Sequence, residues 1–149
     1  CLAVIILQPA RWRMVAAAWV IVAGTALLAN VAQGAIGRLR PNQAETHLAF
    51  TQPFTELLTK ERVSFPSGEA ATAFALACVL SRLLPRWKAA FYAAATLTAV
   101  ARLVNGAHYV SDVAAGALLG ALLADLTFRW LERRRIGERP NPAAPPGPA

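Results

Sequence analysis

Residues 14–33 form a run of twenty residues without a charged side chain, and this run constrains the fold more than any other part of the chain. A helix rises about 1.5 Å per residue, so a helix of this length extends about 30 Å, the thickness of the hydrocarbon core of a bilayer. Three further apolar runs, at 70–81, 89–101 and 113–124, have roughly half to two-thirds of that length. Ionisable side chains at membrane depth are costly, so the charged residues at the ends of these runs are candidate functional residues. They are Glu69, Arg82, Arg102, Asp112 and Asp125.

The composition also favours membrane helices. Hydrophobic residues make up 56% of the chain and charged residues 15%, against roughly 45–50% and 25% in soluble domains. No run alternates with a period of two, and the Ala, Leu and Val content favours helix. We therefore predict an all-α, multi-span transmembrane helical bundle with four visible spans. Residues 1–10, which begin without a Met, are interpreted as the end of a further span.

The net charge of +7 is explained by membrane topology. Nucleic-acid-binding proteins distribute cations through polar sequence, whereas here the cations lie between apolar runs, so we expect a lipid bilayer and no nucleic acid as partner. If the spans alternate, ten of the Lys and Arg residues lie on one side and five on the other, and the positive-inside rule places the ten in the cytoplasm. The protein is then a multi-pass protein of the cell membrane. A soluble or DNA-associated helical bundle is an alternative that only the net charge and the short runs support.

Some residues predict helix packing instead of chemistry. Gly116 and Gly120 form a small-xxx-small face, which favours close contact between helices. Asp125 is expected to pair with Arg129 at i+4. Cys78, inside an apolar run, is interpreted as a small buried hydrophobic residue.

Three polar clusters, at 37–41, 65–69 and 102–112, lie at the ends of the spans that the charge count places outside. Ser67 and Gly68 directly precede an apolar run, where unpaired backbone N–H groups and the helix dipole bind anions. The clusters also contain Arg38, Arg40 and Arg102. The planar guanidinium group of arginine has paired N–H donors that match the oxygens of a phosphate, so these residues are candidates for phosphate binding.

His108 and Asp112 are four residues apart and would share one face of a helix. The carboxylate can then hold one ring nitrogen and leave the other nucleophilic. The sequence thus predicts a phosphate pocket with an oriented histidine. The segment 41–65 is predicted as a loop with a possible short helix at 54–58, and its His47 as a solvated side chain.

These residues resemble the type 2 phosphatidic acid phosphatase superfamily, which includes vanadium-dependent haloperoxidases. The family has three motifs: Lys, six residues, Arg-Pro; Pro-Ser-Gly-His; and Ser-Arg, five residues, His, three residues, Asp. The matching residues are Arg40-Pro41, Pro66-Ser67-Gly68, Arg102, His108 and Asp112. Gln33, Glu69 and Ala101 replace the family's Lys, second-motif His and Ser. The resemblance implies that residues 1–136 form a transmembrane domain with the last four helices of a six-span fold. The Pro-rich residues 137–149 cannot hold a helix and are predicted to be a disordered cytoplasmic tail.

The resemblance also implies roles for the residues, and no metal or other cofactor. His108 would be the nucleophile that forms a phosphohistidine, and Asp112 would orient it. Gln33 can donate a hydrogen bond where the family's Lys binds phosphate. The other phosphate-binding positions are Arg38, Arg40, Ser67, Gly68 and Arg102.

Glu69 is the main departure, because the family's His at this position protonates the leaving oxygen. A carboxyl group does so only if its pKa is raised toward neutrality. Neighbouring arginines would lower the pKa of Glu69 and burial would raise it, and both outcomes stay open at this point.

The expected function is a metal-independent membrane lipid phosphatase whose active site faces the outside or the periplasm. Its expected substrates are phosphomonoesters or diphosphates of lipids, such as phosphatidate, phosphatidylglycerol phosphate or polyprenyl diphosphate. A diphosphate has the better leaving group and needs less acid catalysis, so Glu69 favours diphosphates. The alternative is a catalytically degenerate relative that binds phosphate lipids without turnover.

Overall fold

The structure, a computed structural model, describes residues 9–46, 48–55 and 62–137. Their order is α2 (Pro9–Ile36), α3 (Gly68–Leu83), the short 3-10 helix η1 (Pro85–Trp87), α4 (Lys88–Val104) and α5 (Val110–Gly137). Each of the four predicted apolar runs lies within one of the α-helices, so the all-helical prediction is confirmed. Gly137, predicted as the first residue of the tail, is the last residue of α5.

Some predictions lie outside the described residues. These are most of the partial span at 1–10, the tail from residue 138 onward, and His47. The possible short helix at 54–58 is described only at residues 54 and 55, which form part of a turn.

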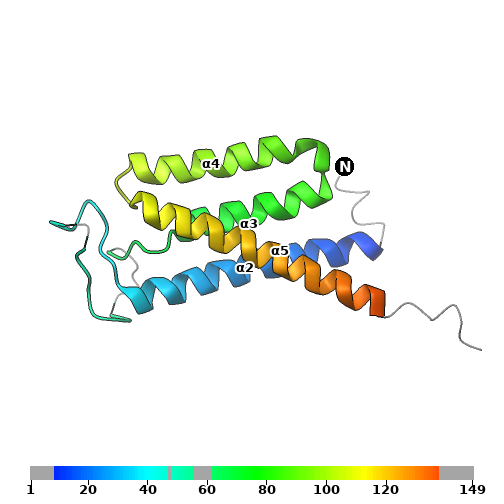
Figure 1. Ribbon diagram of the computed structural model, residues 1–149, viewed down its shortest axis with the longest axis horizontal. Helices are drawn as coiled ribbons and strands as arrows, with labels where there is room; N and C mark the ends of the chain where they lie inside the picture. Colours follow the sequence, from blue (N-terminus) through cyan, green and yellow to red (C-terminus); the bar gives the residue numbers. More distant parts are fainter. Residues whose placement is uncertain (1–8, 47, 56–61, 138–149) are drawn as a thin grey trace, which may run out of the picture.

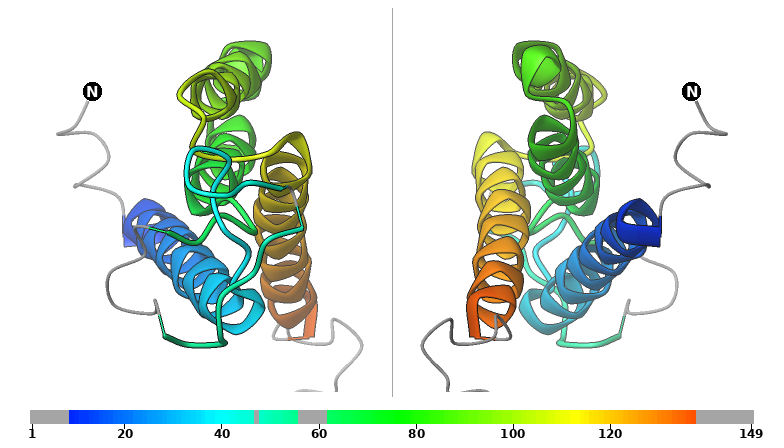
Figure 2. Two further views of the ribbon diagram at one scale, coloured as in Figure 1. Left: turned by 90° about the vertical axis from the view of Figure 1, so that its left-hand side faces the viewer. Right: turned by 90° about the vertical axis from the view of Figure 1, so that its right-hand side faces the viewer.

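The four helices run antiparallel in chain order (Figure 1). The end of α2, the start of α3, the end of α4 and the start of α5 therefore meet at the same end of the bundle. In the end-on views of Figure 2, α3 lies among the other three helices, and it contacts all of them. The three polar clusters predicted from the sequence are thereby gathered at one end of the molecule.

The predicted glycine face brings the backbones of α3 and α5 into contact. A Cβ atom on Gly120 would lie 1.9 Å from the carbonyl oxygen of Ala71, and one on Gly116 would lie 2.3 Å from that of Ser67. Real Cβ atoms do not approach an oxygen so closely, so only glycine permits this spacing. The packing prediction is confirmed, and it fixes the start of α3 against α5.

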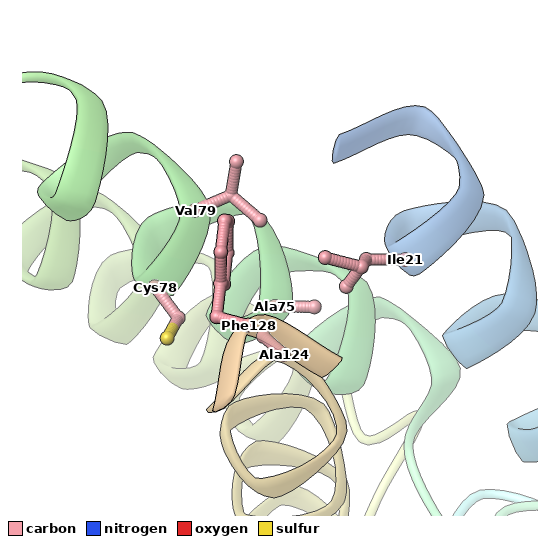
Figure 3. Close-up of a cluster of buried hydrophobic side chains, with 6 residues drawn as sticks. All are labelled: Ile21, Ala75, Cys78, Val79, Ala124 and Phe128. Carbon is pink, nitrogen blue, oxygen red and sulfur yellow. The ribbon is translucent and has the colours of Figure 1, made fainter. Parts of the chain in front are cut away.

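An apolar core cluster holds the other half of the bundle together (Figure 3). Phe128 of α5 packs there against α3, and Cys78 is buried at 8% exposure, as predicted. Next to this cluster, Asp125 binds Arg129 at 2.6 Å, which confirms the predicted pair, and also binds Arg82 of α3. The cluster's buried members are Ile21, Ala75, Cys78, Val79, Ala124 and Phe128.

The outer faces of the helices are apolar. Trp19, Leu97 and Leu118 have 71%, 70% and 61% of their surface exposed. The segments Ala16–Ile36 and Val110–Arg133 are long and apolar enough to cross a membrane. Helices α3 and α4 have 16 and 17 residues, or about 24 and 26 Å. Exposed apolar surface of this extent is suited to contact with lipid.

Between α2 and α3, the described residues 37–46, 48–55 and 62–67 form no helix or extended strand, as predicted for a loop. Two isolated bridges fix it, one between Arg38 and Phe50 and one between Leu39 and Val63. Gly37 starts the segment with a φ of +66°, and a Cβ atom there would lie 2.7 Å from the backbone oxygen of Thr51. The bridges place residues 38–40 beside 62–64, close to the start of α3.

Candidate active site

His108 lies in the turn between α4 and α5 and is buried, with 2% of its surface exposed. Its Nδ1 atom lies 2.8 Å from the carbonyl oxygen of Ser64. A carbonyl oxygen only accepts, so Nδ1 is the donor in this hydrogen bond. The ring is thus oriented by a backbone group of the loop, and its Nε2 atom faces the other way, toward Glu69 at 3.2 Å.

Asp112 has a different environment from the one the spacing predicts. Its Oδ2 atom is 3.9 Å from Nδ1 of His108, which is too long for a hydrogen bond. The i+4 argument applies only within a helix, and His108 precedes the start of α5 at Val110. Oδ2 instead accepts a hydrogen bond from the backbone N–H of Tyr109 at 2.8 Å, at the start of the helix.

Arg38 neutralises the fully buried carboxylate of Asp112. Its Nη1 atom lies 2.7 Å from Oδ1 of Asp112 and also donates to the hydroxyl of Ser111 at 2.7 Å. The guanidinium carbon lies 4.1 Å from the centre of the Tyr109 ring. Because the backbone N–H of Ser67 donates to the carbonyl oxygen of Asp112 at 2.9 Å, Asp112 joins all three polar clusters.

Glu69 lies in the first turn of α3, where its carboxylate contacts both Arg102 and His108. Oε1 is 3.1 Å from Nη2 of Arg102, and Oε2 is 3.2 Å from Nε2 of His108. The hydrogen bond from His108, together with the charge of Arg102, outweighs burial and lowers the pKa of Glu69 from its ordinary value of 4.5 to about 2. Glu69 lies outside the two segments that are long enough to cross a membrane.

The same contacts define the hydrogen-bond partners of both ring nitrogens of His108. Nδ1 faces a carbonyl oxygen and Nε2 faces an ionised carboxylate, so both ring nitrogens need a proton to make their hydrogen bonds. Both ring nitrogens of His108 thus point at hydrogen-bond acceptors, Nδ1 at Ser64 and Nε2 at Glu69. Nε2 can act as a nucleophile only when it carries no proton.

The remaining predicted residues surround the start of α3. Ser67 is fully buried, and its hydroxyl accepts a hydrogen bond from the backbone N–H of Ala70 at 3.3 Å, which caps the helix. Gln33 donates from Nε2 to the carbonyl oxygen of Pro66 at 2.8 Å. Arg40 donates from Nε to the carbonyl oxygen of Val63 at 3.2 Å. Gln33 and Arg40 thus hold the chain just before α3 in place.

A cavity of about 250 Å³ opens between α2 and the start of α3. Four predicted site residues line it, and three residues that the sequence did not single out complete the wall. The predicted residues are Gln33, Arg40, Gly68 and Glu69, and the others are Ala26, Asn30 and Thr72. Across the described ranges, no group of three His, Cys, Asp or Glu side chains is placed to hold a metal ion.

The antiparallel helices with apolar outer faces, together with the polar site at one end, define this chain as an all-helical membrane protein. The PAP2 superfamily matches residues 14–136, so the chain belongs to this family, and the resemblance seen in the motifs is confirmed.

Relatives with assigned names are similar over part of their length. The Lipid A 1-phosphatase of Rhizobium johnstonii is 41% identical over 102 residues, which are 68% of this chain and 41% of that protein. The Lipid A 1-phosphatase of Porphyromonas gingivalis is 32% identical over 108 residues, covering 70% of this chain and 20% of that protein. The chain therefore spans less than half the length of these relatives.

A solved structure has a similar fold. The crystal structure of a transmembrane PAP2 type phosphatidylglycerolphosphate phosphatase from Bacillus subtilis matches with a TM-score of 0.55 and 27% identity. The match covers 78% of this chain and 58% of that one.

Proposed function

We propose that this chain is part of a membrane lipid phosphatase with His108 as the nucleophile. The observation that carries the proposal is the environment of His108. Its ring is buried and oriented by Ser64, and its Nε2 atom faces the Glu69–Arg102 pair at the wall of the cavity. Membership of the PAP2 superfamily and the names of the relatives, which refer to phosphate removal from lipids, support the same function.

Arg102 and Arg40 supply the positive charge that a phosphoryl group needs. Arg102 points Nη2 at the Glu69 carboxylate, and its buried Nε atom has no acceptor within the part of the chain that the structure describes. A phosphoryl oxygen beside Nε2 of His108 would satisfy this donor. Arg40 lines the cavity from the loop side. The proposed chemistry uses side chains alone, with no metal ion or other cofactor.

In the first step, the Nε2 proton of His108 passes to the Glu69 carboxylate, and the phosphoryl group takes the place of that carboxylate beside Nε2. Nε2 then attacks phosphorus, the N–P bond forms and the bond from phosphorus to the leaving oxygen breaks. Glu69 gives its proton to that oxygen, so the lipid leaves as an alcohol. In the second step, water attacks the phosphohistidine and gives a proton to Glu69, the N–P bond breaks, and Glu69 returns the proton to Nε2.

This sequence of proton transfers gives Glu69 a way to act as an acid although its own pKa is low. The proton comes from the histidine at the moment that phosphate replaces the carboxylate. Acid catalysis then serves a phosphomonoester as well as a diphosphate, so the preference for diphosphates suggested by Glu69 alone is not required. We propose lipid phosphomonoesters as the main substrate class.

The proposed orientation places the active site at the extracytoplasmic face and the C-terminal tail in the cytoplasm. It rests on the excess of cations at the other end of the bundle, where Arg82 lies in the last turn of α3, Arg86 in η1 and Lys88 at the start of α4.

A second candidate function is binding of phosphate lipids without turnover. The observation that favours it is the Glu69 carboxylate itself, because it occupies both Nε2 of His108 and Nη2 of Arg102. In this case the protein binds lipid phosphate without releasing phosphate, and the substitution Glu69→His creates turnover.

The test is phosphate release in detergent from phosphatidate, phosphatidylglycerol phosphate and polyprenyl diphosphate. The proposal expects release from at least one of them, loss of release in His108→Ala, and unchanged release in His47→Ala, which removes the chain's other histidine. Phosphate release that persists in His108→Ala would contradict the assigned nucleophile.

A further inference from the structure

The cavity between α2 and α3 extends away from the reacting groups. Its α2 wall consists of Ala26, Asn30 and Gln33, which form one stripe of the helix because they are four and three residues apart. Along the helix axis this stripe covers about 10 Å. At its other wall, Glu69 lines the cavity and also contacts His108 and Arg102. A ligand in the cavity would thus be directly connected to the phosphate position.

The cavity wall combines apolar surface with polar side chains, among them Asn30 and Thr72. Asn30 is partly buried within the candidate span Ala16–Ile36. Within the residues that the structure describes, its side-chain amide makes no hydrogen bond, which is costly for an amide in a membrane helix. Thr72 donates its hydroxyl proton to the backbone oxygens of Gly68 and Glu69, at 3.0 and 3.1 Å, so the lone pairs of that hydroxyl are available as acceptors.

The size of the cavity limits its occupant. A volume of about 250 Å³ holds about eight water molecules, which is comparable to one sugar ring or one glycerol unit. An acyl or prenyl chain in this space would cover the amide of Asn30 and the hydroxyl of Thr72 without pairing them. A group with several hydroxyls would pair both.

We propose that this cavity binds the leaving group of the substrate, and that this group carries several hydroxyls, as a sugar or a glycerol unit does. Asn30 and Thr72 bind its hydroxyls and determine specificity, while Glu69 faces the bond between leaving group and phosphorus. The inference rests on the proposed phosphatase function and adds the class of leaving group to it.

The experiment compares three phosphate lipids in detergent: a lipid-linked glucosamine 1-phosphate, phosphatidylglycerol phosphate, and hexadecyl phosphate, whose leaving group has no other hydroxyl. The variants are Asn30→Leu and Thr72→Val. The matched control for Thr72 is Thr96→Val, because the exposed Thr96 makes the same bond to the backbone four residues earlier, at 2.9 Å to Tyr92. The control for Asn30 is Ala23→Leu, at an exposed position of α2.

Each cavity variant is expected to lower kcat/KM about three- to tenfold for the hydroxylated lipids, the effect of one lost hydrogen bond, and less than about twofold for hexadecyl phosphate. Of the two hydroxylated lipids, the one with the larger loss in kcat/KM shows whether the cavity binds a sugar or a glycerol unit. An equal loss on all three lipids, or no loss on the hydroxylated ones, would overturn the inference.

Equilibrium binding of the same lipids separates this inference from the proposed function. If no lipid is turned over, the phosphatase proposal fails, and binding then decides on the cavity. Tighter binding of hydroxylated lipids that Asn30→Leu abolishes supports the leaving-group site. A preference for hydroxylated lipids that survives in Asn30→Leu overturns the leaving-group inference. The inference is also overturned if the wild-type protein shows no such preference.

Discussion

Replacing Asp112 by Ala tests whether this carboxylate holds the active site together or acts on His108. Asp112 is fully buried, forms an ion pair with Arg38 at 2.7 Å and accepts a hydrogen bond from Tyr109 at 2.8 Å. Removing one partner of a buried ion pair costs about 3–5 kcal/mol, because the other charge stays buried and unpaired. We therefore expect Asp112→Ala to lower the free energy of unfolding by about this amount.

The assay is unfolding by a denaturing detergent in micelles, with Asp125→Ala as the matched control. Asp125 is also on α5 and pairs with two arginines, but its side chain is 31% exposed. Its removal is expected to cost about 1 kcal/mol or less, as for exposed pairs. If Asp112→Ala is no less stable than Asp125→Ala and loses only turnover, then Asp112 serves the histidine and the structural interpretation is refuted.

A double-mutant cycle isolates the pair itself. Arg38→Ala alone leaves the buried carboxylate without its cation and is also expected to be strongly destabilising. The double variant, Arg38→Ala with Asp112→Ala, is expected to be more stable than the sum of the single effects predicts, by at least about 1 kcal/mol. Strict additivity would mean that the two side chains do not interact.

Three further predictions concern packing, pH and phosphate binding. In thermal unfolding, Gly120→Ala is expected to cost about 1–3 kcal/mol, because its Cβ would meet the Ala71 backbone at 1.9 Å, while Gly24→Ala, with open space around it, is expected to cost nothing. Because its pKa is lowered, Glu69 contributes stability above pH 4.5 that is lost as the pH falls toward 2. The wild-type protein is therefore expected to lose more stability between these pH values than Glu69→Gln. Equal losses in the two proteins would count against the Glu69 contacts. Arg102→Lys keeps the positive charge but loses the paired N–H donors of the guanidinium group, so kcat/KM for phosphate release is expected to fall about tenfold or more. An unchanged kcat/KM would exclude direct phosphate binding by this residue.

The sequence predicted the helices and the meeting of the polar clusters because both depend on local patterns. An uncharged run of spanning length specifies a helix on its own, and Gly116 and Gly120 mark a packing face by their spacing. Because consecutive helices run antiparallel, the α2–α3 and α4–α5 connections lie at the same end of the bundle. For this reason the sequence correctly predicted that Glu69 lies at the same end of the bundle as Arg102 and His108, although it is far from both in the sequence.

The hydrogen bonds of the site were not predictable in the same way. The partner of His108 is the backbone carbonyl of Ser64, and a backbone acceptor leaves no signal in the sequence. Its spacing from Asp112 suggested a helix face, but His108 lies in a turn, where the i+4 rule does not apply. Arg38, which was predicted to bind phosphate, pairs with Asp112, and this contact was not predictable because the loop bridges beside Arg38 join residues far apart in the chain.

Attack of Nε2 of His108 on phosphorus would form a phosphohistidine, and this intermediate can be trapped. The protein is mixed with a lipid phosphate labelled with ³²P and quenched within milliseconds under alkaline conditions, in which phosphohistidine survives. We expect protein-bound label that is released by acid, that peptide mass spectrometry locates on His108, and that is missing in His108→Ala. Phosphate release without labelled protein, or label on another residue, would contradict it.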